Sequence, residues 1–262
     1  MEVTRIGICK LCGRETTLTY EHVPPQRAFN QDTVNIIEQE EALKLLTDES
    51  RLPWDTTGLK KRIKQGGTGG YFLCSTCNNN TGSWYMSDYT RFVKTISDLL
   101  IKFNLQHAPN LHFSVLQYPA LSIFKAIMTM FCDINNDCFG DNELRYYLLN
   151  KEATEFNSKR YRIFAYIWKE GFPRRNGLSA QVNSDGSVLY LTEISGYPVG
   201  FILYLDLSEA VQLSDMEITF LSTYKYGEKV DSEFNLKIHG CYTTFPGDFR
   251  SQQEIMNMKS DE

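Results

Sequence analysis

The chain has 262 residues, of which 42% are hydrophobic, so it can fold around one large core or two modest ones. Its formal net charge of -5 argues against a protein that coats nucleic acid nonspecifically, because affinity for the backbone comes from lysine and arginine. No stretch approaches ~20 continuous apolar residues, and the N-terminus lacks an apolar signal core. The sequence therefore predicts a cytoplasmic protein without a membrane partner.

Two C-x-x-C pairs, Cys9 with Cys12 and Cys74 with Cys77, lie in the N-terminal part of the chain. Gly13 follows the first pair and allows a tight turn that brings both sulfur atoms to one ion. Two such pairs predict a closed tetrahedral zinc site with four thiolate ligands. The alternative is two disulfides or stray buried thiols. Neighbouring C-x-x-C disulfides are mainly redox motifs, however, and no βαβ pattern surrounds these pairs.

Between the pairs, residues 16–23 are rich in β-formers and end at Pro24, so Glu21 and His22 are expected at the end of a strand. Taken alone, they would be read as a surface glutamate and a structural histidine. Asn78 directly follows the second pair. A carboxylate, an imidazole and an amide oxygen inside the loop that zinc would close favour a second, catalytic metal site.

A helix is expected after Asn78, because apolar residues then recur close to the 3.6-residue period. Its stripe consists of Tyr85, Tyr89, Phe92, Val93, Ile96, Leu100 and Phe103. Zinc would hold the start of this helix against the strand that carries Glu21 and His22.

This order of motifs resembles the HNH endonucleases of the ββα-metal group, which are built on a treble-clef zinc core. The resemblance covers roughly residues 5–105. It implies that His22 is the general base, that Glu21 and Asn78 hold a catalytic Mg²⁺ or Mn²⁺, and that the four cysteines hold a structural Zn²⁺. The implied activity is hydrolysis of phosphodiester bonds, with DNA favoured over RNA as substrate and partner.

The chain departs from the family pattern in two ways. Residue 21 is glutamate where aspartate is commoner, and the helix lacks the basic residue that many members place beyond the asparagine. The segment between His22 and Cys74 is also long for the family. The asparagine that usually orients the histidine is therefore not assigned, and Asn30 and Asn35 are the candidates.

The assigned roles agree with the chemistry of phosphodiester hydrolysis. A neutral imidazole with a pKa near ~6.5 can accept a proton from the attacking water at physiological pH. Magnesium takes oxygen ligands and completes its octahedron with water and substrate phosphate. Glu21 and Asn78 would supply such a sparse ligand set.

Residues 29–65 are expected to form an insertion with a short helix around residues 40–46 and a break at Pro53. The insertion ends in a basic run of Lys60, Lys61, Arg62 and Lys64, followed by a glycine loop. These cations could bind a nucleic-acid backbone close to the metal site. A solvated charge run beside a flexible loop is an equally good interpretation.

The composition changes near residue 107. A helix is expected to place Ala120, Leu121, Phe124, Ile127, Met128 and Phe131 on one face. Further expectations are a helix at residues 143–149, a turn at Ser184, Asp185 and Gly186, and strands at residues 161–168, 188–194, 199–205, 216–224 and 234–242.

The predicted fold class is α+β. Residues 1–106 form an HNH-like, zinc-stapled domain, and residues 107–262 form an α+β domain with a mainly antiparallel sheet. Cys132, Cys138 and Cys241 are expected to be free thiols, which fits a reducing compartment.

No catalytic constellation is visible in residues 107–262. His107, His112 and His239 occur singly, and Arg174 and Arg175 are expected to face water on a turn, although they could touch phosphate.

This second region could stabilise the nuclease, mediate assembly with a second copy or a partner protein, or recognise a substrate or signal. Nucleases fused to a second domain resemble effectors of prokaryotic immunity, but only at the level of architecture. The alternative function is a noncatalytic zinc-stapled module that binds nucleic acid or protein.

Overall fold

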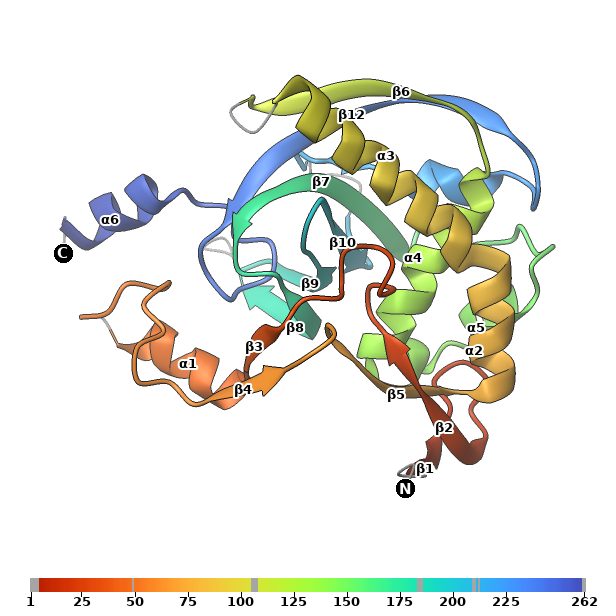
Figure 1. Ribbon diagram of the computed structural model, residues 1–262, viewed down its shortest axis with the longest axis horizontal. Helices are drawn as coiled ribbons and strands as arrows, with labels where there is room; N and C mark the ends of the chain where they lie inside the picture. Colours follow the sequence, from red (N-terminus) through yellow and green to blue (C-terminus); the bar gives the residue numbers. More distant parts are fainter. Residues whose placement is uncertain are drawn as a thin grey trace.

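The computed structural model describes residues 5–48, 50–104, 108–182, 186–208, 211 and 213–260. In this part of the chain a large curved sheet packs against helices that include α3 and α4, and two smaller sheets lie beyond it (Figure 1). The structure is mixed α+β with mainly antiparallel strands, as the sequence predicts.

Seven strands form the large sheet, and all of its recorded neighbours are antiparallel except β12 and β7, which run parallel. In spatial order they are β6 (Asn110–Tyr118), β12 (Val230–Cys241), β7 (Tyr161–Gly171), β10 (Val199–Leu205), β9 (Val188–Ile194) and β8 (Arg175–Val182), with β11 (Met216–Glu217) paired to β7.

Helix α4 (Ala120–Ile134) lies at the centre of the molecule (Figure 1). The sequence predicts an apolar stripe on one face, but every residue from Ala120 to Asp133 is buried. A helix that is almost apolar all round is expected to be covered on all sides.

The other helical segments are shorter or more peripheral. They are α1 (Gln39–Thr47), α2 (Ser75–Thr81), the π-helical turn η1 (Gly82–Met86), α3 (Ser87–Phe103), η3 (Asn136–Gly140), α5 (Asn142–Leu149), η4 (Thr219–Thr223) and α6 (Gln252–Ser260). None of the helices in the described residues is both long enough and apolar enough to cross a membrane.

The N-terminal sheet consists of β1 (Arg5–Ile8), β2 (Glu15–His22) and β5 (Gly69–Cys74), with β2 in the centre and antiparallel to both neighbours. The chain passes from β5 into α2, η1 and α3, so the predicted long helix is present with a π-helical turn in it. Its apolar stripe is buried except at Phe103, which is 57% exposed.

One cluster of buried apolar side chains joins the N-terminal residues to the large sheet. It includes Tyr89 and Phe92 from α3 together with Phe201 and Phe234 from the sheet. Rings from the two parts pack directly, with the centroids of Phe92 and Phe234 5.5 Å apart. The division into domains at residues 106 and 107 stays a prediction.

The strand predicted at residues 216–224 is wrong beyond Glu217, because the chain turns into η4. Thr219 is buried there and its hydroxyl accepts a hydrogen bond from the Ile163 backbone N–H at 2.9 Å. This tertiary contact replaces the strand pairing that the β-forming residues favour.

Two strands in the insertion, β3 (Val34–Ile37) and β4 (Lys61–Lys64), pair with each other and were not predicted, and neither were β6 and β8. The predicted turn residues Ser184 and Asp185 lie outside the described residues.

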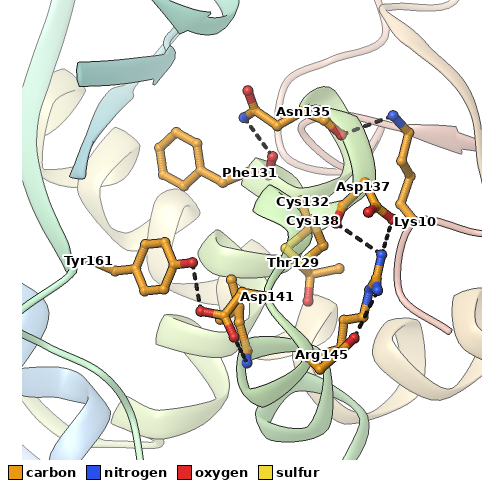
Figure 2. The surroundings of a disulfide bond; sticks show 12 residues. Lys10, Thr129, Phe131, Cys132, Asn135, Asp137, Cys138, Asp141, Arg145 and Tyr161 are labelled. Atoms are coloured by element: carbon orange, nitrogen blue, oxygen red, sulfur yellow. Dashed lines mark hydrogen bonds and ion pairs between the residues drawn. A yellow bond between two sulfur atoms is a disulfide. The ribbon is translucent and has the colours of Figure 1, made fainter. Parts of the chain in front are cut away.

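The prediction that Cys132 and Cys138 are free thiols is wrong, because they form a disulfide between the end of α4 and η3 (Figure 2). The end of α4 and the following turn bring their Cα atoms to 4.4 Å, close enough for the bond. Cys241 is a free, buried thiol, as predicted. Lys10 reaches this region from the turn after β1, and its Nζ donates to the Asn135 carbonyl at 2.9 Å (Figure 2).

Candidate metal centre and the faces of the β2 strand

Four cysteines meet where the N-terminal sheet joins α2. Cys9 and Cys12 lie in the turn between β1 and β2, Cys74 ends β5, and Cys77 lies in the first turn of α2. Their sulfur atoms all lie within 4.8 Å of one another, and those of Cys12 and Cys74 are 4.0 Å apart. Tetrahedral zinc with Zn–S bonds of ~2.3 Å separates its sulfur ligands by roughly 3.8 Å. The cluster can therefore hold one structural zinc ion.

Backbone N–H groups donate to two of the four sulfur atoms in this cluster. The Cys74 backbone N–H donates to the Cys9 sulfur at 3.3 Å, and the Cys77 N–H donates to the Cys74 sulfur at 3.5 Å. The side-chain hydrogen bond with Cys77 lowers the pKa of the Cys9 thiol to about 4. Gly13 takes the positive φ of 68° that the turn needs. Burial raises the pKa of Cys74, and the hydrogen bond with Cys9 raises that of Cys77, so Cys9 is the thiol favoured as the metal-binding thiolate before a cation binds.

Glu21 lies two residues beyond Thr19 on β2 and is only 8% exposed. Its Oε2 atom has no hydrogen-bond partner in the described part of the chain. Burial raises the pKa of Glu21 to about 7. A buried carboxylate oxygen without a donor is costly, so a proton or a cation at this point would stabilise it.

Asp133 of α4 supplies a second carboxylate that the sequence analysis missed. It is 1% exposed, and neither of its carboxylate oxygens has a partner among the described residues. Burial raises the pKa of Asp133, and the charge of nearby Glu21 raises it further. The Lys10 ammonium acts on Asp133 in the opposite direction and lowers its pKa. The only signal in the sequence is an acidic residue inside an otherwise apolar helix. Glu21 and Asp133 together hold three buried carboxylate oxygens without donors, which are the type of ligand atom that a hard divalent cation takes.

Asn78 lies on the same side of the N-terminal sheet as Glu21. Its Nδ2 donates to the Thr19 hydroxyl at 3.0 Å, and Thr19 and Glu21 share a face because alternate residues of a strand point the same way. This bond occupies the amide NH₂ group, so the oxygen Oδ1 is the atom that would bind a metal.

His22 points to the opposite face of β2. Its ring lies 5.1 Å from that of Tyr20, its neighbour on the same face, and its Nε2 is 2.9 Å from the Gly66 carbonyl oxygen. A carbonyl only accepts hydrogen bonds, so Nε2 carries the hydrogen and Nδ1 of the neutral ring carries the lone pair. In the part of the chain that the structure describes, no hydrogen bond joins any two of Glu21, His22 and Asn78.

Asn30 holds the loop that supplies the Gly66 carbonyl. Its Nδ2 donates to the Thr68 carbonyl and its Oδ1 accepts the Thr68 backbone N–H, both at 2.7 Å. Gly67, with a φ of 89°, lies so close that an added Cβ would be 2.0 Å from the Asn30 carbonyl oxygen. The loop therefore requires glycine here, and Asn30 orients His22 indirectly. Asn35, the other candidate, is exposed on β3.

Most of the basic run already has local partners. The Arg62 guanidinium lies 3.2 Å from Glu38, and the Lys61 Nζ donates to Thr56 at 2.7 Å. Lys60, Lys61 and Arg62 are exposed.

Lys64 differs from the rest of the run because its side chain turns towards the side of β2 that carries Tyr20 and His22. Its Nζ lies 4.3 Å from the centre of the Tyr20 ring and 3.4 Å from the Gly69 carbonyl oxygen. Of the four predicted cations, the structure places this one beside His22.

The two arginines predicted on a solvent-exposed turn are both largely covered, so that prediction is wrong. Arg174 is 3% exposed, and its guanidinium lies 3.2 Å from the buried carboxylate of Glu193. Arg175 begins β8, and its Nη1 is buried without a partner among the described residues.

The remaining histidines have structural partners or lie outside the described residues, as His107 does. His239 lies 2.7 Å from Asp215 and stacks on Phe249 with ring centroids 4.0 Å apart. His112 is exposed and lies 3.6 Å from Glu233.

Comparison of this chain with protein-family models, with curated proteins and with solved structures finds no match.

Proposed function

We propose that the chain is a metal-dependent endonuclease of the HNH type, which hydrolyses phosphodiester bonds in nucleic acid, with DNA preferred to RNA. The observation that carries the proposal is the hydrogen bond between the His22 Nε2 and the Gly66 carbonyl, at 2.9 Å. It fixes the ring and leaves Nδ1 as the acceptor, which is the state that a general base requires.

His22 would take the proton from the attacking water. The water oxygen adds to phosphorus, the proton passes to Nδ1, and the bond from phosphorus to the 3′ oxygen breaks. Asn30 would keep the base in place through the loop at residues 66–68. The partly buried position of His22 limits the ring motion that would otherwise misdirect the proton transfer.

The residues fit a catalytic divalent cation as well as a structural zinc ion. Glu21 and Asn78 lie on one side of the sheet, and Asp133 adds two unpartnered oxygens. Because His22 projects from the other side, the base and the cation would have to meet at the end of β2, where His22 is the last residue. All three supply oxygen, which Mg²⁺ and Mn²⁺ prefer, whereas the zinc cluster is all sulfur. When bound, such an ion would neutralise charge on the phosphate and assist the departing oxygen. The two sites would take different metals.

The alternative is a noncatalytic zinc-stapled module that binds nucleic acid or protein. The burial of Glu21, which raises its pKa to about 7, favours this alternative because a protonated carboxyl group is a poor metal ligand. The alternative predicts binding without cleavage at every concentration of divalent ion. A role as an effector of prokaryotic immunity stays an analogy from architecture.

A cleavage assay on plasmid DNA and on RNA, with added Mg²⁺ or Mn²⁺, tests the proposal. His22→Ala should lower the cleavage rate by at least ~100-fold, the usual scale for loss of a positioned general base, while zinc content and nucleic-acid binding are unchanged. His112→Ala is the matched control, because that histidine is exposed and far from β2 in the sequence. Undiminished cleavage by His22→Ala would move the base elsewhere, and the absence of cleavage by the unaltered protein would favour the noncatalytic module.

A further inference from the structure

The face of β2 that carries His22 gathers positive charge around two tyrosine rings. Tyr20 and Tyr71 come from paired strands and their ring centroids are 5.4 Å apart. The Lys64 Nζ lies 4.3 Å from the centre of the Tyr20 ring, and the Arg5 guanidinium lies 4.9 Å from that of Tyr71. We call Tyr20, His22, Lys64 and Arg175 the His22 face.

Arg175 reaches this face from the large sheet. It is the first residue of β8, and it interacts electrostatically with Tyr20, Arg62 and Glu38, all from the N-terminal part of the chain. Figure 1 draws β8 in the large sheet and β3 in the N-terminal part. The second region therefore contributes a cation next to the proposed general base.

The carboxylates around Arg175 do not neutralise it. The preceding Arg174 pairs with Glu193, whereas the Arg175 Nη1 is buried and has no partner among the described residues. Glu38 is the one carboxylate among the charges acting on Arg175, and its Oε1 lies 3.2 Å from Arg62. A buried N–H group without an acceptor is destabilising unless a ligand supplies one.

The Tyr20 hydroxyl is a second unpartnered group on the same face. Its oxygen is buried and makes no hydrogen bond with any described residue. Two donors without acceptors, beside a lysine ammonium, match a ligand that carries negative charge on several oxygen atoms. A phosphodiester has these properties, and an arginine fork binds it with two parallel hydrogen bonds.

We propose that Arg175 and Lys64 bind a backbone phosphate of the nucleic acid beside His22, so that the binding site is built from both parts of the chain. The identity of the anion rests on the proposed function. In this arrangement the Arg175 Nη1 and the Tyr20 hydroxyl donate to the phosphate and Lys64 supplies a point charge. Both donor atoms are buried, so binding has to expose them. The second region then acts in substrate binding as well as in packing.

Binding of a short fluorescent DNA duplex, measured over a series of salt concentrations in the His22→Ala background, tests this inference separately from cleavage. Arg175→Gln should weaken binding by ~10-fold or more and reduce the slope of log K against log salt by about 1, as expected for the loss of one phosphate contact. Arg175→Lys should recover part of the affinity, because it keeps the charge but lacks the fork.

The matched control is Arg91→Gln on α3, which removes an equal charge from a side chain that is 69% exposed and close to Asp88. Its affinity and salt slope should stay close to those of the background protein. Zinc content and melting temperature are measured for every variant, and Lys64→Gln decides the question if Arg175→Gln fails to fold. Salt slopes for Arg175→Gln and Lys64→Gln equal to that of Arg91→Gln would overturn the inference. If Arg175→Gln and Lys64→Gln weaken binding as expected but the unaltered protein cleaves no nucleic acid, the nuclease proposal is rejected and the phosphate site is retained.

Discussion

The N-terminal sheet and the α4 core, which consists of α4 and the side chains packed on it, differ in how much apolar surface they bury. On β1, Ile6 and Ile8 are 73% and 59% exposed, although Leu73 of β5 is buried in the same cluster as α4. Around α4, by contrast, side chains such as Phe124 and Phe131 are completely buried. Small zinc modules obtain much of their folding free energy from the metal, whereas the core obtains it from apolar burial. Glu21, His22 and Asn78 therefore lie in the part that holds the four-cysteine cluster, whereas Asp133 and Arg175 come from the other part.

The largest expected effect comes from removing a zinc ligand. Cys77→Ser should reduce bound zinc from about one ion per chain to almost none, and it should unfold the N-terminal sheet. The α4 core should survive, because its burial does not involve the metal. Elemental analysis measures the zinc, and hydrogen exchange resolved along the chain shows which segments lose protection.

Cys241→Ser is the matched control, since Cys241 is also a buried thiol but lies outside the cluster. It should keep its zinc and the protection of β1, β2 and β5. Less than about half a zinc ion per chain in the native protein would contradict the four-cysteine site. If Cys77→Ser loses hydrogen-exchange protection equally in the N-terminal sheet and in the α4 core, the two parts do not differ in their dependence on zinc.

Removal of a buried side chain from the α4 core should lower stability without releasing zinc. Phe124→Ala removes a completely buried ring whose centroid lies 4.8 Å from that of Phe156. The free energy of unfolding should fall by ~3–5 kcal/mol while zinc stays bound below the unfolding transition. Urea denaturation measures the loss. Phe103→Ala, at a ring that is 57% exposed, should change stability by less than about 0.5 kcal/mol.

Strong periodic patterns predict the fold well, and isolated residues predict it poorly. The apolar stripe that begins at Tyr85 predicts the long helix, and the alternating segments predict most strands of the large sheet. The exposed strand β4 gives no such signal, because the basic run lacks an apolar face, and β3 has only four residues, too few to establish a period. At Thr219 a tertiary hydrogen bond overrides the local preference for a strand.

The candidate site residues also differ in how well the sequence predicts that they come together. The paired spacing of the cysteines predicts their cluster, since each pair is local in the sequence. Asp133 and Arg175 lie far from β2 in the sequence, and only the packing of α4 and β8 brings them near Glu21 and Tyr20. The Cys132–Cys138 disulfide was missed because the spacing of the two residues does not reveal how the chain turns after α4.

A smaller effect is expected when one ligand of the proposed catalytic cation is removed. Glu21→Ala and Asn78→Ala should weaken cleavage in a way that higher Mg²⁺ or Mn²⁺ partly restores, because they remove ligands and leave the base. Added metal should not restore His22→Ala. Metal rescue therefore separates the ligands of the cation from the residue that accepts the proton.

Asp133→Asn should have the smallest effect, because Glu21 and Asn78 remain. We expect the dissociation constant for Mn²⁺, measured by electron paramagnetic resonance, to rise by ~10-fold, with zinc content unchanged. Stability without divalent ions should stay the same or increase, since the amide replaces a carboxylate whose oxygens have no donors and whose pKa is raised by burial first and then by the charge of Glu21. If Asp133 were instead part of the packing alone, Asn would leave Mn²⁺ binding unaltered. If Asp133→Asn binds Mn²⁺ as tightly as the unaltered protein, the metal site is confined to the N-terminal part. The two regions would then share only their apolar core and the phosphate contact at Arg175.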